Sequence, residues 1–415
     1  MKLIIVHFFC IITLSLLGQE NAGRFIKDAR TGCMIWDEYY APEDSISWEG
    51  KCKDKLADGS GTLIWYAHGK ETARYAGSML KGNPNGKGKY IFVGAGKLEG
   101  NFVDGVLLNL EDPYLKRLEK NKISIVDSTD LYVNDGKSQT LFYYALVPKG
   151  KIKGALVLLP STDETPEEVF SNNVKLTELA CDSNLLTIIP SINSHVCLDN
   201  VALDFLNTTF AEAIKKYKIP SDKFVIGGLS LGGMLSLRYT EQSYENSSKT
   251  TIVPIAVFGA DPPVDLSTLY YQFQRDIERN YSQPAVSEAK SYLTEMNKIF
   301  GGSPNQHPEK YVQYSMYSRS KQDGGNAKFL KAVPVRIYSD PDIDWQMKNK
   351  HRDYYDLNAP DQTAMINELH LMGNNKAEFI NSLGKGFRLD GTRHPHSWSI
   401  VDAGDTINWI MKYLE

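Results

Sequence analysis

Residues 225–233 read V-I-G-G-L-S-L-G-G, and this stretch decides how we interpret the chain. The apolar run before Ser230 is typical of a buried strand, and the run L-G-G-M-L-S-L-R-Y after it can open a helix. Residues 228–232 match G-x-S-x-G, a motif whose serine stands on a sharp turn from a strand into a helix. We therefore expect the hydroxyl of Ser230 to be exposed at such a turn.

The glycines around Ser230 have a steric explanation. A sharp turn brings the residues two before and two after the serine almost into contact, and only Gly228 and Gly232 are small enough there. The N-terminus of the following helix directs free N–H groups and the positive end of its dipole at the serine. The N–H of Leu231 is therefore the first candidate donor to a developing oxyanion.

Strand-like and helix-like segments alternate on both sides of this turn. The predicted strands cover residues 123–127, 140–148, 155–160, 185–190, 224–228, 252–259 and 333–338, and the predicted helices cover 167–180, 201–217 and 402–414. This alternation predicts an α/β domain with a mostly parallel central sheet. The uninterrupted apolar strands predict that helices cover both faces of that sheet.

A serine hydroxyl needs a base to remove its proton, and the base needs an acid to orient it. In this architecture the acid follows a late strand and precedes the histidine in the chain. Asp342 best matches the acid after the seventh strand, with Asp340 and Asp344 as fallbacks and Asp261 as a weaker option. Each aspartate could instead cap a helix or a turn.

Four histidines follow these acids: His351, His370, His394 and His396. The run R-H-P-H-S-W precedes the last predicted helix, where the base is expected. We choose His396 because His-Ser-Trp resembles the histidine loop of many esterases. The rival reading, a metal site formed by His394 and His396, lacks a third nearby ligand of the right type.

These features resemble the α/β-hydrolase superfamily, and within it the esterase and prolyl-oligopeptidase-like group. The resemblance covers about residues 111–415 and includes K-I-P-S-D-K-F-V-I-G-G-L-S-L-G-G and H-P-E-K-Y-V-Q-Y-S-M-Y-S. It implies a serine hydrolase, most simply a carboxylic-ester hydrolase, that works through a Ser230–Asp342–His396 triad and an acyl-enzyme, with no cofactor and no metal.

The sequence departs from this family after the third strand, where His-Gly is usual and L-P-S-T-D-E-T stands instead. A backbone N–H does not depend on the side chain, so Thr162, or else Ser161, can still provide the second oxyanion donor. Residues 262–330 exceed what one connecting helix needs. This tyrosine-rich stretch predicts a helical lid, or else ordinary packing of an enlarged fold.

A repeat precedes the α/β domain. Copies begin at Trp48, Tyr75 and Leu98, and the two complete copies share an aromatic-x-Gly start, a turn and Gly-x-Gly. This period predicts stacked β-hairpins. The motifs resemble MORN repeats, which implies a small all-β module at 24–110 that binds a surface or polymer and has no catalytic groups. We interpret His68 as a turn residue.

Residues 1–18 have one positive charge and an apolar stretch too short to span a membrane, as in a secretory signal peptide; a buried N-terminal helix is the alternative. The four later cysteines fit disulfides Cys33–Cys52 and Cys181–Cys197, with buried thiols as the alternative. We therefore expect a secreted or periplasmic protein without a transmembrane segment.

The net charge of −4 over 415 residues argues against nucleic acid and anionic membranes as partners. The expected partner is a small-molecule or polymer-attached ester. A serine peptidase of the same fold and a catalytically silent surface-binding protein remain alternatives.

Overall fold

The computed structural model describes residues 24–37, 42–94, 96–125, 130–134 and 137–414. The predicted signal peptide at 1–18 lies outside this part of the chain. The described residues form two compact units, which divide between Lys116 and Arg117.

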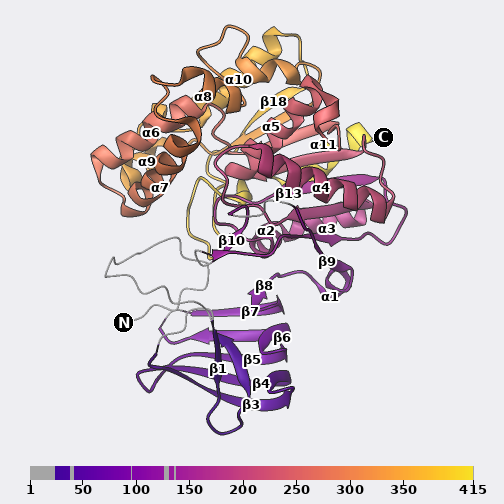
Figure 1. The fold of residues 1–415 in the computed structure, drawn as a ribbon, viewed down its shortest axis with the longest axis vertical. Coiled ribbons are helices and arrows are strands. Elements are labelled where there is room, and N and C mark those ends of the chain that lie inside the picture. The colour runs from indigo at the N-terminus through magenta and orange to yellow at the C-terminus, as the bar shows by residue number, and fades with distance from the viewer. Residues whose placement is uncertain (1–23, 38–41, 95, 126–129, 135–136, 415) are drawn as a thin grey trace. The chain divides into compact units, whose positions relative to one another are not determined.

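The N-terminal unit is dominated by one eight-stranded sheet in which most neighbouring strands are antiparallel (Figure 1). Its order is β1-β2-β4-β5-β6-β7-β8, β3 pairs with β4, and the single contact between β2 and β4 is parallel. The elements are β1 (Arg24–Lys27), β2 (Met34–Asp37), β3 (Asp44–Lys53), β4 (Leu56–Ala67), β5 (Lys70–Leu80), β6 (Asn83–Phe92), β7 (Gly96–Val103), β8 (Val106–Leu107) and α1 (Asp112–Leu115).

The repeated glycines form a row across this sheet. Gly50, Gly61, Gly77, Gly88 and Gly100 pair in succession from β3 to β7. Buried aromatic rings lie over the row. A Cβ atom added at Gly61 would be 2.3 Å from a ring carbon of Trp48, and one at Gly88 would be 2.2 Å from the hydroxyl of Tyr75. The repeat spacing thus reflects aromatic rings that pack on bare backbone; the MORN assignment stays a prediction.

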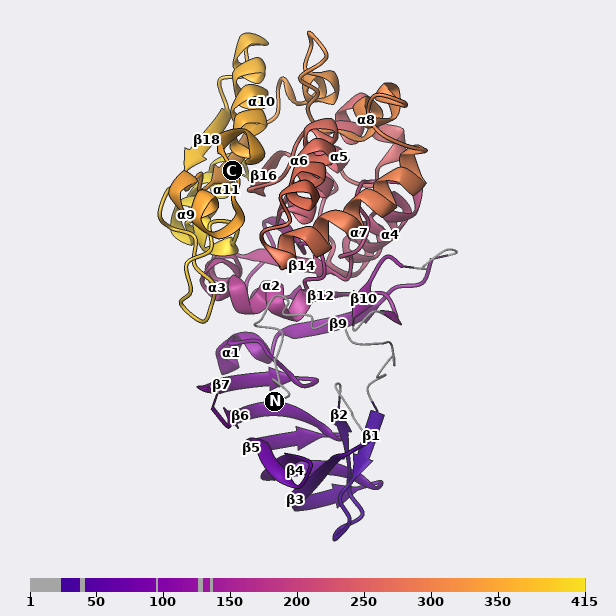
Figure 2. The same cartoon turned by 90° about the vertical axis from the view of Figure 1, so that its left-hand side faces the viewer.

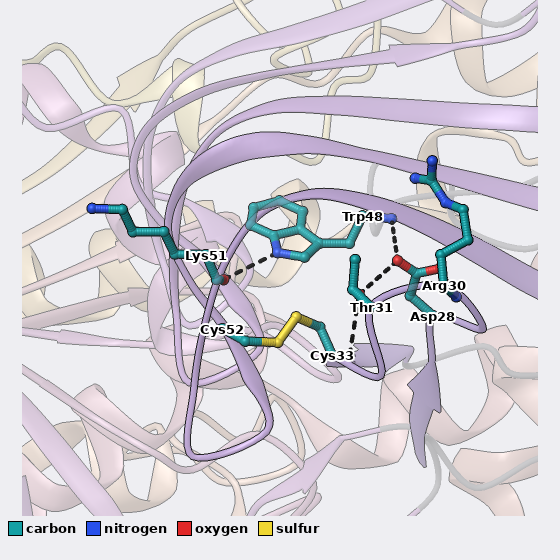
Figure 3. Close-up of a disulfide and its surroundings, with 7 residues drawn as sticks. All are labelled: Asp28, Arg30, Thr31, Cys33, Trp48, Lys51 and Cys52. Atoms are coloured by element: carbon teal, nitrogen blue, oxygen red, sulfur yellow. Dashed lines mark hydrogen bonds between the residues drawn. A yellow bond between two sulfur atoms is a disulfide. The ribbon is translucent and has the colours of Figure 1, made fainter.

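The predicted disulfide Cys33–Cys52 is present (Figure 3). It ties the segment after β1 to the end of β3, beside the buried Trp48. Asp28 supports the same corner, since its carboxylate accepts hydrogen bonds from the Thr31 hydroxyl at 2.7 Å and from the Trp48 N–H at 3.3 Å. His68 lies in the turn between β4 and β5 with a φ of 50°, as a turn residue.

The C-terminal unit contains the predicted α/β domain with its mostly parallel sheet. The strand order is β18-β17-β16-β15-β13-β14-β12-β9; the six strands from β18 to β14 are parallel, and β12 is antiparallel to both of its neighbours. The strands are β9 (Leu118–Lys122), β10 (Val133–Asn134), β11 (Lys137–Ser138), β12 (Phe142–Leu146), β13 (Gly154–Leu159), β14 (Leu185–Pro190), β15 (Phe224–Leu229), β16 (Ala256–Ala260), β17 (Val335–Ser339) and β18 (Ala377–Asn381).

Helices surround this sheet, and every residue of β12 to β17 is buried, as expected for a sheet covered on both faces. The α-helices are α2 (Pro166–Asn172), α3 (Val174–Asp182), α4 (Asn200–Tyr217), α5 (Leu231–Glu245), α6 (Leu266–Arg279), α7 (Gln283–Phe300), α8 (Pro308–Tyr314), α9 (Ile343–Lys350), α10 (Ala359–Leu371) and α11 (Ala403–Leu414). The 3₁₀ helices are η1 (Ser247–Lys249), η2 (Gly325–Leu330), η3 (Tyr354–Asp356) and η4 (Trp398–Ile400). Helices α6, α7 and α8, from the stretch predicted as a lid, lie together (Figure 2).

Two local predictions differ from the structure. The first strand of the domain is β9, which precedes the predicted 123–127, because residues 118–122 pair with β12. The predicted helix 167–180 is two helices, α2 and α3, interrupted at Asn173. The Asn173 side chain donates to the carbonyl of Val169 at 2.9 Å and so ends α2.

The predicted disulfide Cys181–Cys197 is wrong, because both thiols are free and buried. Cys181 lies at the end of α3, just before β14, and Cys197 lies beyond the opposite end of that strand. A six-residue strand is about 20 Å long, whereas the Cα atoms of a disulfide lie within about 7 Å. The short spacing in sequence therefore hid a full strand between the two cysteines.

Candidate active site

Ser230 forms the predicted turn between β15 and α5. Its backbone has a φ of 53° and a ψ of −116°, a region that residues other than glycine rarely occupy. Two hydrogen bonds hold it there: the Ser230 N–H donates to the carbonyl of Ala260 at 2.9 Å, and its carbonyl accepts from the N–H of Met234 at 3.0 Å. Strain of this kind is kept where the surrounding structure enforces it, which is frequent at functional sites.

The glycines around Ser230 are as crowded as the sequence predicted. A Cβ atom at Gly228 would lie 2.3 Å from the carbonyl carbon of Gly232, and one at Gly232 would lie 2.0 Å from the carbonyl oxygen of Leu159. The turn therefore packs directly on the end of β13. Gly233 is also confined, since its Cβ would lie 2.9 Å from Pro262.

The loop after β13 leaves one backbone donor available. The N–H of Ser161 donates to the side chain of Glu164, that of Asp163 to the carbonyl of Asn193, and that of Glu164 to the carbonyl of Ser161. Among residues 161–164, all of them described, only the N–H of Thr162 has no hydrogen-bond acceptor in the structure. Thr162, rather than Ser161, is therefore the donor that this loop can offer beside the Leu231 N–H at the start of α5.

His396 pairs with Asp261. Nδ1 of His396 lies 2.7 Å from Oδ2 of Asp261, and their side chains are 30% and 15% exposed. Asp261 directly follows Ala260, which pairs with Leu229 in the sheet and accepts the Ser230 N–H. The pair therefore stands at the carboxyl end of β16, next to the turn that carries Ser230. No described residue, Ser230 included, forms a hydrogen bond with Nε2 of His396.

Asp261 is held firmly in its ionised form. Its Oδ1 accepts hydrogen bonds from the Ser339 hydroxyl at 3.1 Å and from Nε2 of Gln362 at 3.0 Å, and its carbonyl accepts from Asn358 at 2.9 Å. Burial alone would raise the pKa of Asp261, but the contact with His396 and the hydrogen bonds from Gln362 and Ser339 hold that pKa below its usual value.

The structure does not bring the predicted acid Asp342 to the histidine, and here the sequence prediction is corrected. Asp342 caps α9 by accepting the N–H of Trp345 at 2.9 Å and also pairs with Arg393 at 2.8 Å. Of the fallbacks, Asp344 lies in the first turn of α9. The physical reason is the order of the strands in the sheet. Asp261, which reaches His396, follows β16, the neighbour of β15, and β15 ends at the serine; Asp342 follows β17, one strand further away.

The other fallback, Asp340, holds the loop that carries His396, residues 382–402. Its buried carboxylate accepts hydrogen bonds from the N–H groups of Gly384 at 3.1 Å and Gly386 at 2.8 Å, and from Arg393 at 2.8 Å. Arg393 also donates to the carbonyl of Gly386 at 2.6 Å. Sequence reasoning missed this role, because the loop that returns to Asp340 begins more than forty residues later in the chain.

His394 makes structural contacts within the loop that carries His396. Its Nδ1 lies 2.8 Å from the carbonyl oxygen of His396, and its ring packs edge-on against Trp345. Burial, aided by the positive charges of Lys350 and Arg388, lowers the pKa of His394 to about 2. His394 is therefore neutral at physiological pH. Among the residues that the structure describes, no three His, Cys, Asp or Glu side chains gather as metal ligands.

The predicted lid reaches the loop of residues 161–164 through Tyr292 of α7. The hydroxyl of Tyr292 forms a hydrogen bond with the hydroxyl of Thr162, and burial raises the pKa of Tyr292, so this phenol stays protonated. The residue is only 8% exposed. The insertion therefore meets the site at the residue that offers a free N–H.

No family model and no curated protein matches the chain. In the described part, no helix has the length and apolar character that a membrane span requires. Solved structures with a similar course of the chain include a ferulic acid esterase, at 14% identity and a TM-score of 0.42, with 71% of this chain and 97% of that chain covered.

Two further similar structures are a carboxyl esterase 2 from the mycorrhizal fungus Tuber melanosporum and an S-formylglutathione hydrolase from Agrobacterium tumefaciens. The first has 14% identity and a TM-score of 0.43, covering 74% of this chain and 87% of that chain. The second has 9% identity and a TM-score of 0.41, covering 72% and 95%. These three TM-scores are below 0.5, so none of these likenesses bears on the function of this chain.

Proposed function

We propose that the chain is a serine hydrolase of the α/β-hydrolase type that cleaves a carboxylic ester. Ser230 is the nucleophile, His396 the general base and Asp261 the acid that orients it. The observation that carries the proposal is the convergence of a strained serine and an Asp–His pair at the carboxyl ends of two adjacent parallel strands.

The residues present account for each step of ester cleavage. Asp261 accepts the proton on Nδ1 of His396 in a hydrogen bond, which leaves Nε2 unprotonated and able to take the proton of the Ser230 hydroxyl. The serine oxygen attacks the ester carbonyl, and the N–H groups of Leu231 and Thr162 stabilise the oxyanion. His396 then protonates the departing alcohol, and water hydrolyses the acyl-serine by the same route.

Two further proposals concern the role of the N-terminal unit and the location of the protein. We propose that the glycine-rich sheet is an accessory module of the MORN type that binds a surface or a polymer. The disulfide Cys33–Cys52 supports an oxidising location, since such bonds persist mainly outside the cytosol. A secreted or periplasmic hydrolase fits this observation.

The test compares wild type, Ser230→Ala and Ser161→Ala on p-nitrophenyl esters of increasing acyl length and on aminoacyl p-nitroanilides. Ser161 is the matched control because it takes part in the loop's hydrogen bonds through its backbone N–H and carbonyl, which the substitution keeps. We expect ester turnover that Ser230→Ala lowers by about 10⁶-fold and Ser161→Ala leaves within about threefold. Turnover of anilides alone would favour a peptidase, and no Ser230-dependent turnover of either class would favour a silent binding protein.

A further inference from the structure

Glu164 lies between two segments that are far apart in the sequence. Its carboxylate accepts the N–H of Ser161 at 2.9 Å on one side. On the other side both oxygens accept from Nε1 of Trp398, at 2.8 and 3.1 Å. A third donor, Nδ2 of Asn172 in α2, lies 3.1 Å from Oε1. None of these residues takes part in the steps described above.

On its first side, Glu164 fixes the loop that offers the Thr162 N–H. The backbone N–H of Glu164 closes a turn onto the carbonyl of Ser161 at 3.2 Å, and its side chain closes the same turn onto the Ser161 N–H. The first bond holds the peptide group between Ser161 and Thr162, which carries the Thr162 N–H, and the second holds the peptide group before Ser161. An oxyanion donor is effective only if it is held in place before the charge develops.

On its second side, Glu164 fixes the loop that carries the base. Trp398 follows His396 by two residues, is 2% exposed and begins η4. The indole N–H is a donor only, so it needs an acceptor when it is buried, and Glu164 is the acceptor that it has.

The donor set explains why a carboxylate is needed. Ser161, Asn172 and Trp398 all donate to Glu164, and only an ionised carboxylate accepts with both oxygens and has no proton to place. Burial works against this form and, with the nearby charge of Glu168, raises the pKa of Glu164 to about 8, so the carboxyl is fully ionised only above that pH. The same group contacts both halves of the site.

We propose that Glu164 is a positioning residue that ties the oxyanion loop (residues 161–164) to the histidine loop (residues 382–402). It thereby holds the Thr162 N–H and His396 in fixed positions relative to each other during acyl transfer. The inference rests on the proposed function and extends it to a residue that touches neither substrate nor the reacting atoms.

The test uses four single variants of the full chain. Glu164→Ala removes the tie, and Glu164→Gln keeps its volume but must turn its NH₂ toward Trp398 and either Ser161 or Asn172. Trp398→Phe removes the indole N–H and keeps an aromatic ring. Asn172→Ala is the matched control, because its bond does not join the two loops.

We expect Glu164→Ala to lower kcat by about 10²-fold, the cost of one misplaced oxyanion donor, with KM within about threefold of wild type. Glu164→Gln and Trp398→Phe should each lower kcat by about tenfold, and Asn172→Ala by less than threefold. The double variant Glu164→Ala/Trp398→Phe should be no slower than Glu164→Ala, because the shared bond is already lost.

Rates are expressed per active site, titrated with a fluorophosphonate probe. A merely structural Glu164 would reduce the number of active sites and leave kcat per site unchanged, and that result would overturn the inference. Additive losses in the double variant would overturn it as well. If wild type itself shows no Ser230-dependent turnover, the proposed function fails first and this inference falls with it.

Discussion

Asp261→Asn changes the hydrogen bonding at the proposed catalytic acid and keeps the shape of its side chain. Ser339 and Gln362 both donate to Oδ1, so the amide oxygen of asparagine is expected to take that place. The NH₂ group then faces Nδ1 of His396, where the carboxylate Oδ2 stood at 2.7 Å. Nδ1 must accept this hydrogen bond, the ring proton moves to Nε2, and His396 can no longer take the proton of Ser230.

The expected loss is large because it removes the correct tautomer and not merely a contact. An equivalent change in a serine–histidine–aspartate triad lowers kcat by about 10⁴-fold, which corresponds to about 5.5 kcal/mol of transition-state stabilisation. We expect the same order of loss in kcat for ester hydrolysis, with KM little changed. Initial rates per titrated active site, together with the melting temperature, measure this effect apart from unfolding.

Asp342→Asn is the matched control. Asparagine caps a helix about as well as aspartate, so the bond to the Trp345 N–H survives and mainly the charge facing Arg393 is lost. We expect kcat within about threefold of wild type and a stability loss below about 1 kcal/mol. A folded Asp342→Asn variant that loses as much activity as Asp261→Asn would refute the assignment of the acid, as would an Asp261→Asn variant within tenfold of wild type.

Three other perturbations have defined outcomes. Gly232→Ala places a Cβ atom 2.0 Å from the carbonyl oxygen of Leu159, so this variant should lose soluble expression or all ester turnover, whereas retained activity would contradict the sharp turn. Reduction of Cys33–Cys52, which closes a loop with a sequence separation of 19, should cost about 3 kcal/mol, measured as denaturant unfolding with and without dithiothreitol; an unchanged midpoint would contradict it. Because the pKa of His394 is lowered from 6.5 to about 2 on folding, the unfolded chain binds a proton between these pH values and the folded chain does not. The free energy of unfolding therefore falls as pH falls from 6.5 toward 2. His394→Asn should therefore unfold with a weaker dependence on pH, on the order of 2 kcal/mol less between pH 6.5 and 4.5, while keeping ester turnover.

The local features of the site could be predicted from the sequence because they depend on neighbouring residues. The turn at Ser230 needs small residues two positions away on each side, and both are visible in the chain. His396 stands in the loop between β18 and the last helix, and the sequence also marks that helix. The alternating strands and helices predicted the α/β domain for the same reason.

The partners of these residues could not be predicted because they depend on which strands adjoin. Asp261 and Asp342 both follow apolar strands, and only the three-dimensional structure shows that the loop of His396 returns to β16. The one sequence signal that could have singled out Asp261 was its place directly after the strand that follows the Ser230 turn in the chain. Likewise, the contact of Glu164 with Trp398 spans 234 residues, a separation at which sequence spacing carries no information.

The role of Ser230 is tested most directly by covalent labelling of the wild-type protein with a fluorophosphonate probe, with the labelled site mapped by peptide mass spectrometry. We expect a single adduct on Ser230, absent from Ser230→Ala and formed more slowly in Asp261→Asn. No adduct on the folded wild-type protein, or an adduct on another residue that persists in Ser230→Ala, would contradict the assignment of Ser230 as the nucleophile.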